Sequence, residues 1–294
     1  MSIGAEKILR GQIIEHLNEL ASASGTVTRD QLWDFDLDGT THRLIDRSLG
    51  IRNPRNMLAT LSIMSAPDGP YTDQEVDGSL FAYDYREGTD DGDNAKLRRA
   101  YQLELPIILL RKLSPDLYLP ICPVYVVDDN RKKRQFLIAL DAELLKIDQP
   151  MNPTELERKY VRQVTKRRLH QPEFRARVLL AYKSRCAVCR LGHGKLLDAA
   201  HIVPDPDDDG APVVENGLSL CKIHHAAYDT ALLGIDPDYR IHISPQLSDS
   251  AESPIIEYGF HQLNGGKIAV PSRAADRPDA DRLRVRFERF REAC

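Results

Sequence analysis

The chain has 294 residues, 42% of them hydrophobic and 29% charged, and a formal net charge of −4. This composition is typical of a soluble globular protein of about two domains and excludes a disordered, collagen-like or disulfide-scaffold chain. No apolar run is long enough to cross a membrane and no signal-peptide pattern opens the chain, so we expect a cytoplasmic protein. Five cysteines in such a chain favour metal binding over disulfide bonds.

The first 43 residues predict a helical extension. Apolar residues recur at helical spacing over 5–21, and Thr28 has the pattern of a second helix start. The apolar positions of the first helix are Ile8, Leu9, Ile13, Ile14, Leu17 and Leu20. We interpret this segment as a helical flap or dimer element, with a DNA contact as the alternative.

Residues 44–147 have the pattern of a compact β-barrel or sandwich. Short strand-like runs are separated by turn residues, and one clear helix interrupts them at 94–103. The expected strands are 58–64, 80–85, 105–110, 118–121, 124–127 and 136–140.

A basic linker helix is expected over 148–170, where a linker at 148–153 precedes a helix at 154–170. A second helix is expected over 172–183. Between Arg158 and Arg190 the chain has eleven lysines and arginines and one acid, Glu173. Such a concentration of positive charge favours contact with nucleic-acid phosphates, and a solvated helix face is the alternative.

The last segment, 171–294, contains further regular elements. We expect strands at 239–244 and 254–258, a hairpin with an Asn-Gly turn at 263–268, and a closing amphipathic helix at 279–292. The acidic loop at 205–210 contains proline and glycine, so we interpret it as a solvated turn rather than a metal site.

Two pairs of metal-ligand residues lie in this segment. Cys186 and Cys189 are separated by two residues, and so are Cys221 and His224. Two such pairs can form a closed tetrahedral site, and thiolates with imidazole favour Zn²⁺ over Mg²⁺ or Ca²⁺. The alternative is two buried cysteines and a surface pair that bind no metal.

Residues 170–235 resemble the HNH nucleases, which have a ββα-metal fold. The resemblance rests on 197–204 with its histidine, on the Asn-Gly at 216–217, and on the double histidine at 224–225, all between or beside the cysteine pairs. It implies metal-dependent hydrolysis of DNA phosphodiesters with Mg²⁺ or Mn²⁺. It further implies that His201 is the general base, that Asn216 ligates the metal or holds the loop, and that His225 is a metal ligand.

The sequence departs from that family directly before the candidate base. Many members have aspartate or histidine there, and this chain has Ala200, which cannot ligate a metal. In a regular strand Asp198 lies on the same face as position 200. We therefore take Asp198 as a candidate metal ligand, with a solvated strand residue as the alternative.

Residues 44–145 are similar in order to SRA domains, which are PUA-like barrels that bind modified cytosine. The similarity rests on 70–78, 80–85, 93–97, 105–108 and 123–126. It implies that Tyr71 and Tyr83 stack on a flipped base and that Asp73 hydrogen-bonds the cytosine edge. The family acid commonly falls one residue later, where this chain has Gln74. The alternative is that both tyrosines are packing residues of the barrel.

These features together predict an α+β protein in which an N-terminal helical extension and an SRA/PUA-like barrel precede a zinc-stapled HNH domain. The order resembles that of SRA-HNH restriction endonucleases. It implies an enzyme that cuts double-stranded DNA containing 5-methylcytosine or a related base. Because HNH modules commonly cut one strand each, a double-strand break would imply a homodimer or two encounters. Two alternatives are an HNH nuclease indifferent to methylation and a non-catalytic, zinc-stapled DNA-binding protein.

Overall fold

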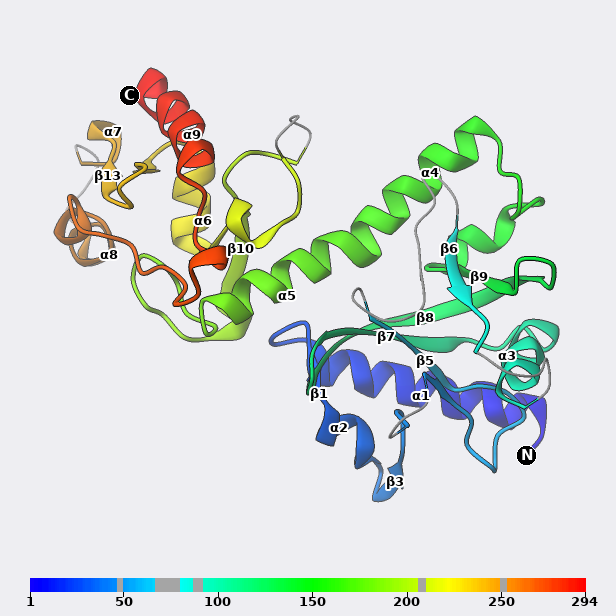
Figure 1. The fold of residues 1–294 in the computed structure, drawn as a ribbon. Helices are drawn as coiled ribbons and strands as arrows, with labels where there is room; N and C mark the ends of the chain where they lie inside the picture. The colour runs from blue at the N-terminus through cyan, green and yellow to red at the C-terminus, as the bar shows by residue number, and fades with distance from the viewer. Residues whose placement is uncertain (47–49, 67–79, 87–91, 206–209, 249–252) are drawn as a thin grey trace. The chain divides into compact units, whose positions relative to one another are not determined.

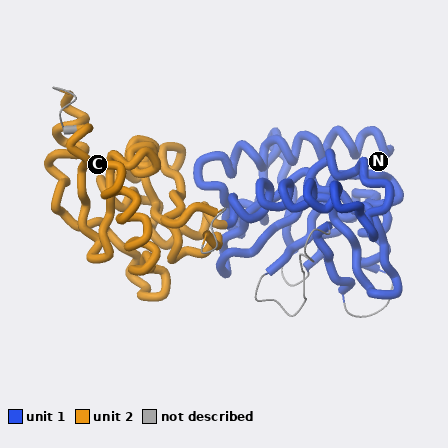
Figure 2. Tube along the Cα trace, turned by 90° about the horizontal axis from the view of Figure 1, so that it is seen from above, with its two compact units in different colours: residues 1–173 blue, residues 174–294 orange. Residues whose placement is uncertain are grey.

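The computed structural model describes residues 1–46, 50–66, 80–86, 92–205, 210–248 and 253–294. The contacts divide the chain into two compact units, residues 1–173 and 174–294 (Figure 2). Each unit has its own hydrophobic core, and each is described by itself below.

Unit 1 is built on a curled, mixed sheet of seven strands (Figure 1). The spatial order is β4-β5-β7-β8-β9-β6, β1 pairs with the start of β8, and the β5–β7 pair is the parallel one. The strands are β1 (Val27–Thr28), β4 (Ile51–Arg52), β5 (Ser62–Ser65), β6 (Phe81–Asp84), β7 (Ile107–Ser114), β8 (Leu117–Asn130) and β9 (Gln135–Ala139).

The two strands expected at 118–121 and 124–127 form one long strand, β8. This strand pairs with β7 as far as Val124 and with β9 from Tyr125 onward. The change of partner, between Val124 and Tyr125, falls inside the second of the two expected runs. The fold class is therefore mixed α+β, as predicted, and the SRA/PUA identity of this sheet stays a prediction.

Helix α1 (Ile3–Ala21) confirms the first predicted helix, but its buried face differs from the expected one. Ile13, Ile14 and Leu17 pack in the core, whereas Ile8 is 68% exposed. The buried face also contains Arg10, whose guanidinium donates to the carbonyls of three residues in other segments and to the Glu6 carboxylate. A polar clamp therefore holds the helix at its N-terminal half, where an apolar contact was expected.

The remaining elements of unit 1 are short. Thr28 caps the second predicted helix through a capping box with Gln31. The elements are α2 (Arg29–Trp33), β2 (Phe35–Leu37), β3 (Thr40–His42), α3 (Asp93–Gln102), η1 (Ala142–Lys146) and α4 (Glu155–Thr165), which is followed by the π turn η2 (Lys166–His170). Val161, Val164 and Leu169 belong to the same core as the sheet.

Unit 2 contains the predicted ββα arrangement. Strands β10 (Leu197–His201) and β11 (Gly217–Cys221) pair antiparallel, and α6 (Lys222–Asp229) follows β11 directly. The other elements are α5 (Gln171–Ala181), η3 (Gly194–Leu196), η4 (Val214–Asn216), β12 (Leu233–Ile235), β13 (Ile241–Ile243), α7 (Pro245–Ser248), α8 (Pro254–Gly259), η5 (His261–Leu263), η6 (Ala274–Asp276) and α9 (Ala280–Ala293).

Two expectations for unit 2 were wrong. The strand expected at 254–258 is helix α8, which begins with Pro254, a residue favoured at the first helical turn. Its Ile255 and Tyr258 are exposed, so this segment does not contribute a strand to the core. The turn at 263–268 forms with Gly265 at φ +77°, but the chain after it bridges from Lys267 to Arg240 and makes no separate hairpin.

Among the described residues, no helix has the length and apolar character needed to cross a membrane.

Candidate metal and nuclease site

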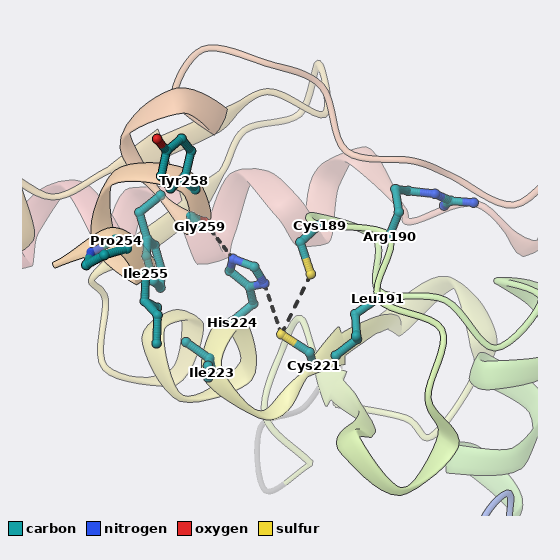
Figure 3. Close-up of a pocket in the computed structure, with 11 residues that line it drawn as sticks. Cys189, Arg190, Leu191, Cys221, Ile223, His224, Pro254, Ile255, Tyr258 and Gly259 are labelled. Atoms are coloured by element: carbon teal, nitrogen blue, oxygen red, sulfur yellow. Dashed lines mark hydrogen bonds between the residues drawn. The ribbon is translucent and has the colours of Figure 1, made fainter.

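The two predicted ligand pairs come together in unit 2. Cys186 and Cys189 follow α5, Cys221 ends β11, and His224 lies in the first turn of α6. Figure 3 shows Cys189, Cys221 and His224 of this set. The four ligand atoms all lie within 4.8 Å of one another. His224 Nδ1 is 3.1 Å from the Cys221 sulfur and 3.6 Å from the Cys186 sulfur. This Cys₃His cluster is able to bind a metal ion.

The surroundings of the cluster suit a metal ligand set. His224 Nε2 lies 2.8 Å from the carbonyl oxygen of Gly259, so an Nε2–H donates there and leaves the Nδ1 lone pair facing the sulfurs (Figure 3). Hydrogen bonds from the Cys186 and Cys189 thiols hold the pKa of Cys221 well below its ordinary value. Thiolate is the form of cysteine that binds metal, and three sulfurs and one imidazole nitrogen that lie this close together favour a soft divalent ion.

His201, the candidate base, ends strand β10 and lies directly opposite Gly217 of β11. Its ring stacks on Phe174 of α5 with centroids 4.1 Å apart and planes 21° from parallel. A Cβ at Gly217 would lie 2.4 Å from Val178 Cγ2 and 3.0 Å from Phe174 Cζ. Glycine is therefore required at position 217, because α5 packs directly on the hairpin there and leaves no space for a Cβ. The same packing places the Phe174 ring against the His201 ring.

Asn216 is fully buried, and its carboxamide bonds to the backbone at three points. Its Oδ1 accepts from Val203 N at 2.9 Å, while its Nδ2 donates to Val203 O at 3.0 Å and to Ala211 O at 3.1 Å. These bonds fasten the chain on both sides of the β10–β11 connection. Of the two roles that the sequence left open for Asn216, this arrangement favours holding the loop.

His225 lies on a different face of α6 from the preceding cluster residue, His224, because consecutive residues of a helix lie about 100° apart. Its Nε2 lies 3.3 Å from Oδ2 of Asp229, one helical turn later. Asp198 Oδ1 lies 3.3 Å from the Arg175 guanidinium. Asp229 was missed by the sequence reasoning. The spacing of four residues after His225 on a helix could have identified it.

Of the three candidate base-binding residues, the structure describes only Tyr83. Tyr71 and Asp73 lie outside the described residues. Tyr83 on β6 is 6% exposed, belongs to the core of unit 1, and donates from its hydroxyl to the Gly50 carbonyl at 3.1 Å. This position favours the packing role that the sequence allowed for Tyr83.

Part of the basic stretch at 158–190 serves structure within its own unit. Arg168 donates to the carbonyls of Leu140 and Pro123, and Arg175 donates to the carbonyl of Leu197. Other cations of the stretch are exposed; they include Lys159, Lys183, Arg185 and Arg190. The stretch is therefore neither wholly structural nor wholly available to a ligand.

Comparison with known proteins adds a family for this segment. Residues 186–236 match the HNH endonuclease family. A solved structure of the modification-dependent TagI restriction endonuclease resembles the chain at 18% identity and a TM-score of 0.33, over 89% of this chain and 90% of that one. A TM-score of that size does not establish a shared fold. No curated protein matches the chain.

Proposed function

We propose that this chain, a DNA endonuclease with an HNH domain, cuts only modified DNA: unit 1 recognises 5-methylcytosine or a related base, and unit 2 hydrolyses a phosphodiester nearby. The observation that carries the nuclease assignment is the ββα arrangement within residues 186–236. There His201 stands at the end of β10, and the Cys₃His cluster joins the hairpin to α6.

His201 is the general base of the proposed reaction. Hydrolysis of a phosphodiester needs a group that takes a proton from the attacking water. The His201 imidazole is oriented by its stack on Phe174, and the hairpin beneath it is fastened by the three bonds of Asn216. A base held in one orientation loses less entropy when the water and phosphate are aligned.

His225 and Asp229 are the residues that would hold the catalytic cation. Their Nε2 and Oδ2 atoms are 3.3 Å apart, close to the roughly 3 Å that separates adjacent ligands of an octahedral ion at about 2.1 Å. When bound, Mg²⁺ or Mn²⁺ offsets negative charge on the phosphate. We keep Asp198 as a further ligand, although Arg175 lies beside its carboxylate.

The Cys₃His cluster has a structural role in this proposal. It takes ligands from the chain after α5, from the end of β11 and from α6, and we assign Zn²⁺ to it. A closed set of four protein ligands leaves no open position for a substrate. The bound ion would therefore stabilise the fold around the catalytic residues and take no part in hydrolysis.

Recognition of a modified base is assigned to unit 1 on the tyrosine and aspartate pattern alone. A flipped cytosine needs an aromatic face and an acceptor for its amino group, which Tyr71 and Asp73 would supply. The burial of Tyr83 supports the competing function, a nuclease indifferent to methylation. If Tyr71→Ala and Asp73→Ala leave the preference for modified DNA unchanged, the recognition pocket lies elsewhere.

The nuclease assignment is tested by metal-dependent cleavage of DNA by the full chain and by its His201→Ala variant. We expect cutting with Mg²⁺ or Mn²⁺, and loss of cutting but not of DNA binding in His201→Ala. The matched control is His193→Ala, which removes an exposed histidine of the same unit. If the chain without substitutions binds DNA but does not cut it, the result would favour a non-catalytic DNA-binding protein. That alternative is open because Ala200 has no atom that can ligate a metal.

A homodimer is a further proposal. One HNH site cuts one strand, so a double-strand break requires two copies or two encounters. Sedimentation of the chain with and without DNA distinguishes two copies from two encounters. If two copies act together, a dimer should be observed, at least in the presence of DNA.

A further inference from the structure

A cavity of about 450 Å³ lies between α9 and the chain that connects β10 to β11. Val203 and Glu215 line it from the connecting segment. Arg282, Val285 and Arg289 line it from one face of α9, at the spacing of three, four and seven residues that places helix side chains in a row. The cavity thus has two guanidinium groups on one wall.

The cavity adjoins the strand end that carries the candidate base. Val203 is two residues beyond His201, and its backbone N–H and C=O are both bonded by the Asn216 carboxamide. The Asp279 N–H donates to the Glu215 carbonyl at 2.9 Å, which ties the start of α9 to the residue before Asn216. A ligand in the cavity would therefore be held by the same loop that Asn216 fastens.

Arg282 offers an unused donor in this cavity. Its Nη1 is buried and has no hydrogen-bond partner among the described residues. A buried N–H without an acceptor is costly, so such a group favours binding of a ligand that brings one. Of the acids that also line the cavity, Asp279 accepts from the Arg282 backbone N–H and Asp281 pairs with Arg284.

We infer that this cavity binds a backbone phosphate of the DNA, next to the phosphate that is cut, with Arg282 as the main donor and Arg289 as a second. The inference rests on the proposed nuclease function. A planar guanidinium matches the geometry of a phosphate and is the usual choice for such a contact. Binding there would fix the position of the DNA strand relative to His201, and the Glu215 carboxylate would oppose it.

The test measures DNA affinity of the full chain in a His201→Ala background, with a short fluorescent duplex over a series of salt concentrations. Arg282→Gln should weaken binding severalfold and reduce the slope of log affinity against log salt by about one, the effect of losing one phosphate contact. Arg291→Gln is the matched control, because nine residues along a helix place it on the opposite face, and it should change neither quantity. Arg282→Lys should fall between, and it guards against misfolding of the glutamine variant.

A second variant predicts a change of opposite sign. Glu215→Gln removes the carboxylate that opposes a phosphate, so DNA affinity should rise. If Arg282→Gln and Arg291→Gln bind DNA with equal affinity while the chain without substitutions still binds and cuts DNA, the inference is wrong and the nuclease function stands. If the unmodified chain neither binds nor cuts, the proposed function itself fails. If inorganic phosphate binds in an Arg282-dependent way and DNA affinity does not change, the cavity serves a free phosphate compound, which also overturns the inference.

Discussion

Replacing Asn216 with aspartate separates its two candidate roles. Aspartate keeps an oxygen that can ligate a metal, and it can still accept from the Val203 N–H. It cannot make the two donor bonds that Asn216 Nδ2 gives to the carbonyls of Val203 and Ala211, at 3.0 Å and 3.1 Å. A ligand role therefore predicts a functional variant, whereas a loop-holding role predicts a damaged one.

The expected loss of stability follows from these contacts. Two hydrogen bonds at about 1 kcal/mol each account for about 2 kcal/mol. A buried carboxylate that faces two carbonyl oxygens adds about as much again, so we expect a loss of about 4 kcal/mol in the free energy of unfolding of unit 2. For a unit of this size, each kcal/mol corresponds to roughly 4 °C, so the melting temperature should fall by roughly 15 °C.

Calorimetry of the full chain measures this loss. Release of the cysteine-bound metal identifies the transition that belongs to unit 2. The matched control is Asn264→Asp, because the exposed Asn264 side chain only accepts, from the Ile243 N–H, and aspartate can do the same. A change under about 1 kcal/mol for Asn216→Asp, together with cleavage at a lower metal concentration, would refute the loop-holding role.

Three further predictions concern the metals and unit 1. Cys221→Ser, or removal of the metal by a chelator, should unfold unit 2 and abolish cleavage while the fluorescence of Trp33 in unit 1 stays native; an active, metal-free Cys221→Ser protein would contradict the structural role of the ion. Asp229→Asn should raise the Mg²⁺ or Mn²⁺ concentration needed for half-maximal cleavage about 10- to 100-fold, and an unchanged metal dependence would remove Asp229 from the site. Arg10→Met leaves the Glu6 carboxylate buried without its partner, so urea unfolding followed by Trp33 fluorescence should show a loss of about 3–5 kcal/mol; a loss below about 1 kcal/mol would show that the clamp on α1 is not needed.

The metal cluster was predictable because the two residues of each ligand pair are close in sequence and have a fixed spacing. Cys186 and Cys189 form one turn, Cys221 and His224 form another, and only the closing of one pair on the other depends on the fold. Local patterns of this kind survive in the fold because their contacts are made within a few residues. The strands β10 and β11 and the helix after them were expected from the resemblance to the HNH nucleases rather than from a local pattern.

Features that depend on distant residues could not be predicted. The Phe174 ring against His201 and the requirement for glycine at 217 arise from the packing of α5 on the hairpin, which no local pattern records. Arg10 has the spacing of a helix surface residue, yet three carbonyls far along the chain draw it into the core. Helix α8 was taken for a strand because a short, partly apolar segment fits either structure when its partners are unknown.

The most direct test of the proposed function compares one plasmid in unmethylated and cytosine-methylated form, incubated with the full chain and Mg²⁺ or Mn²⁺. We predict that only the methylated plasmid is cut and that His201→Ala cuts neither. Equal cutting of both forms would contradict recognition of the modified base and leave an HNH nuclease without that specificity.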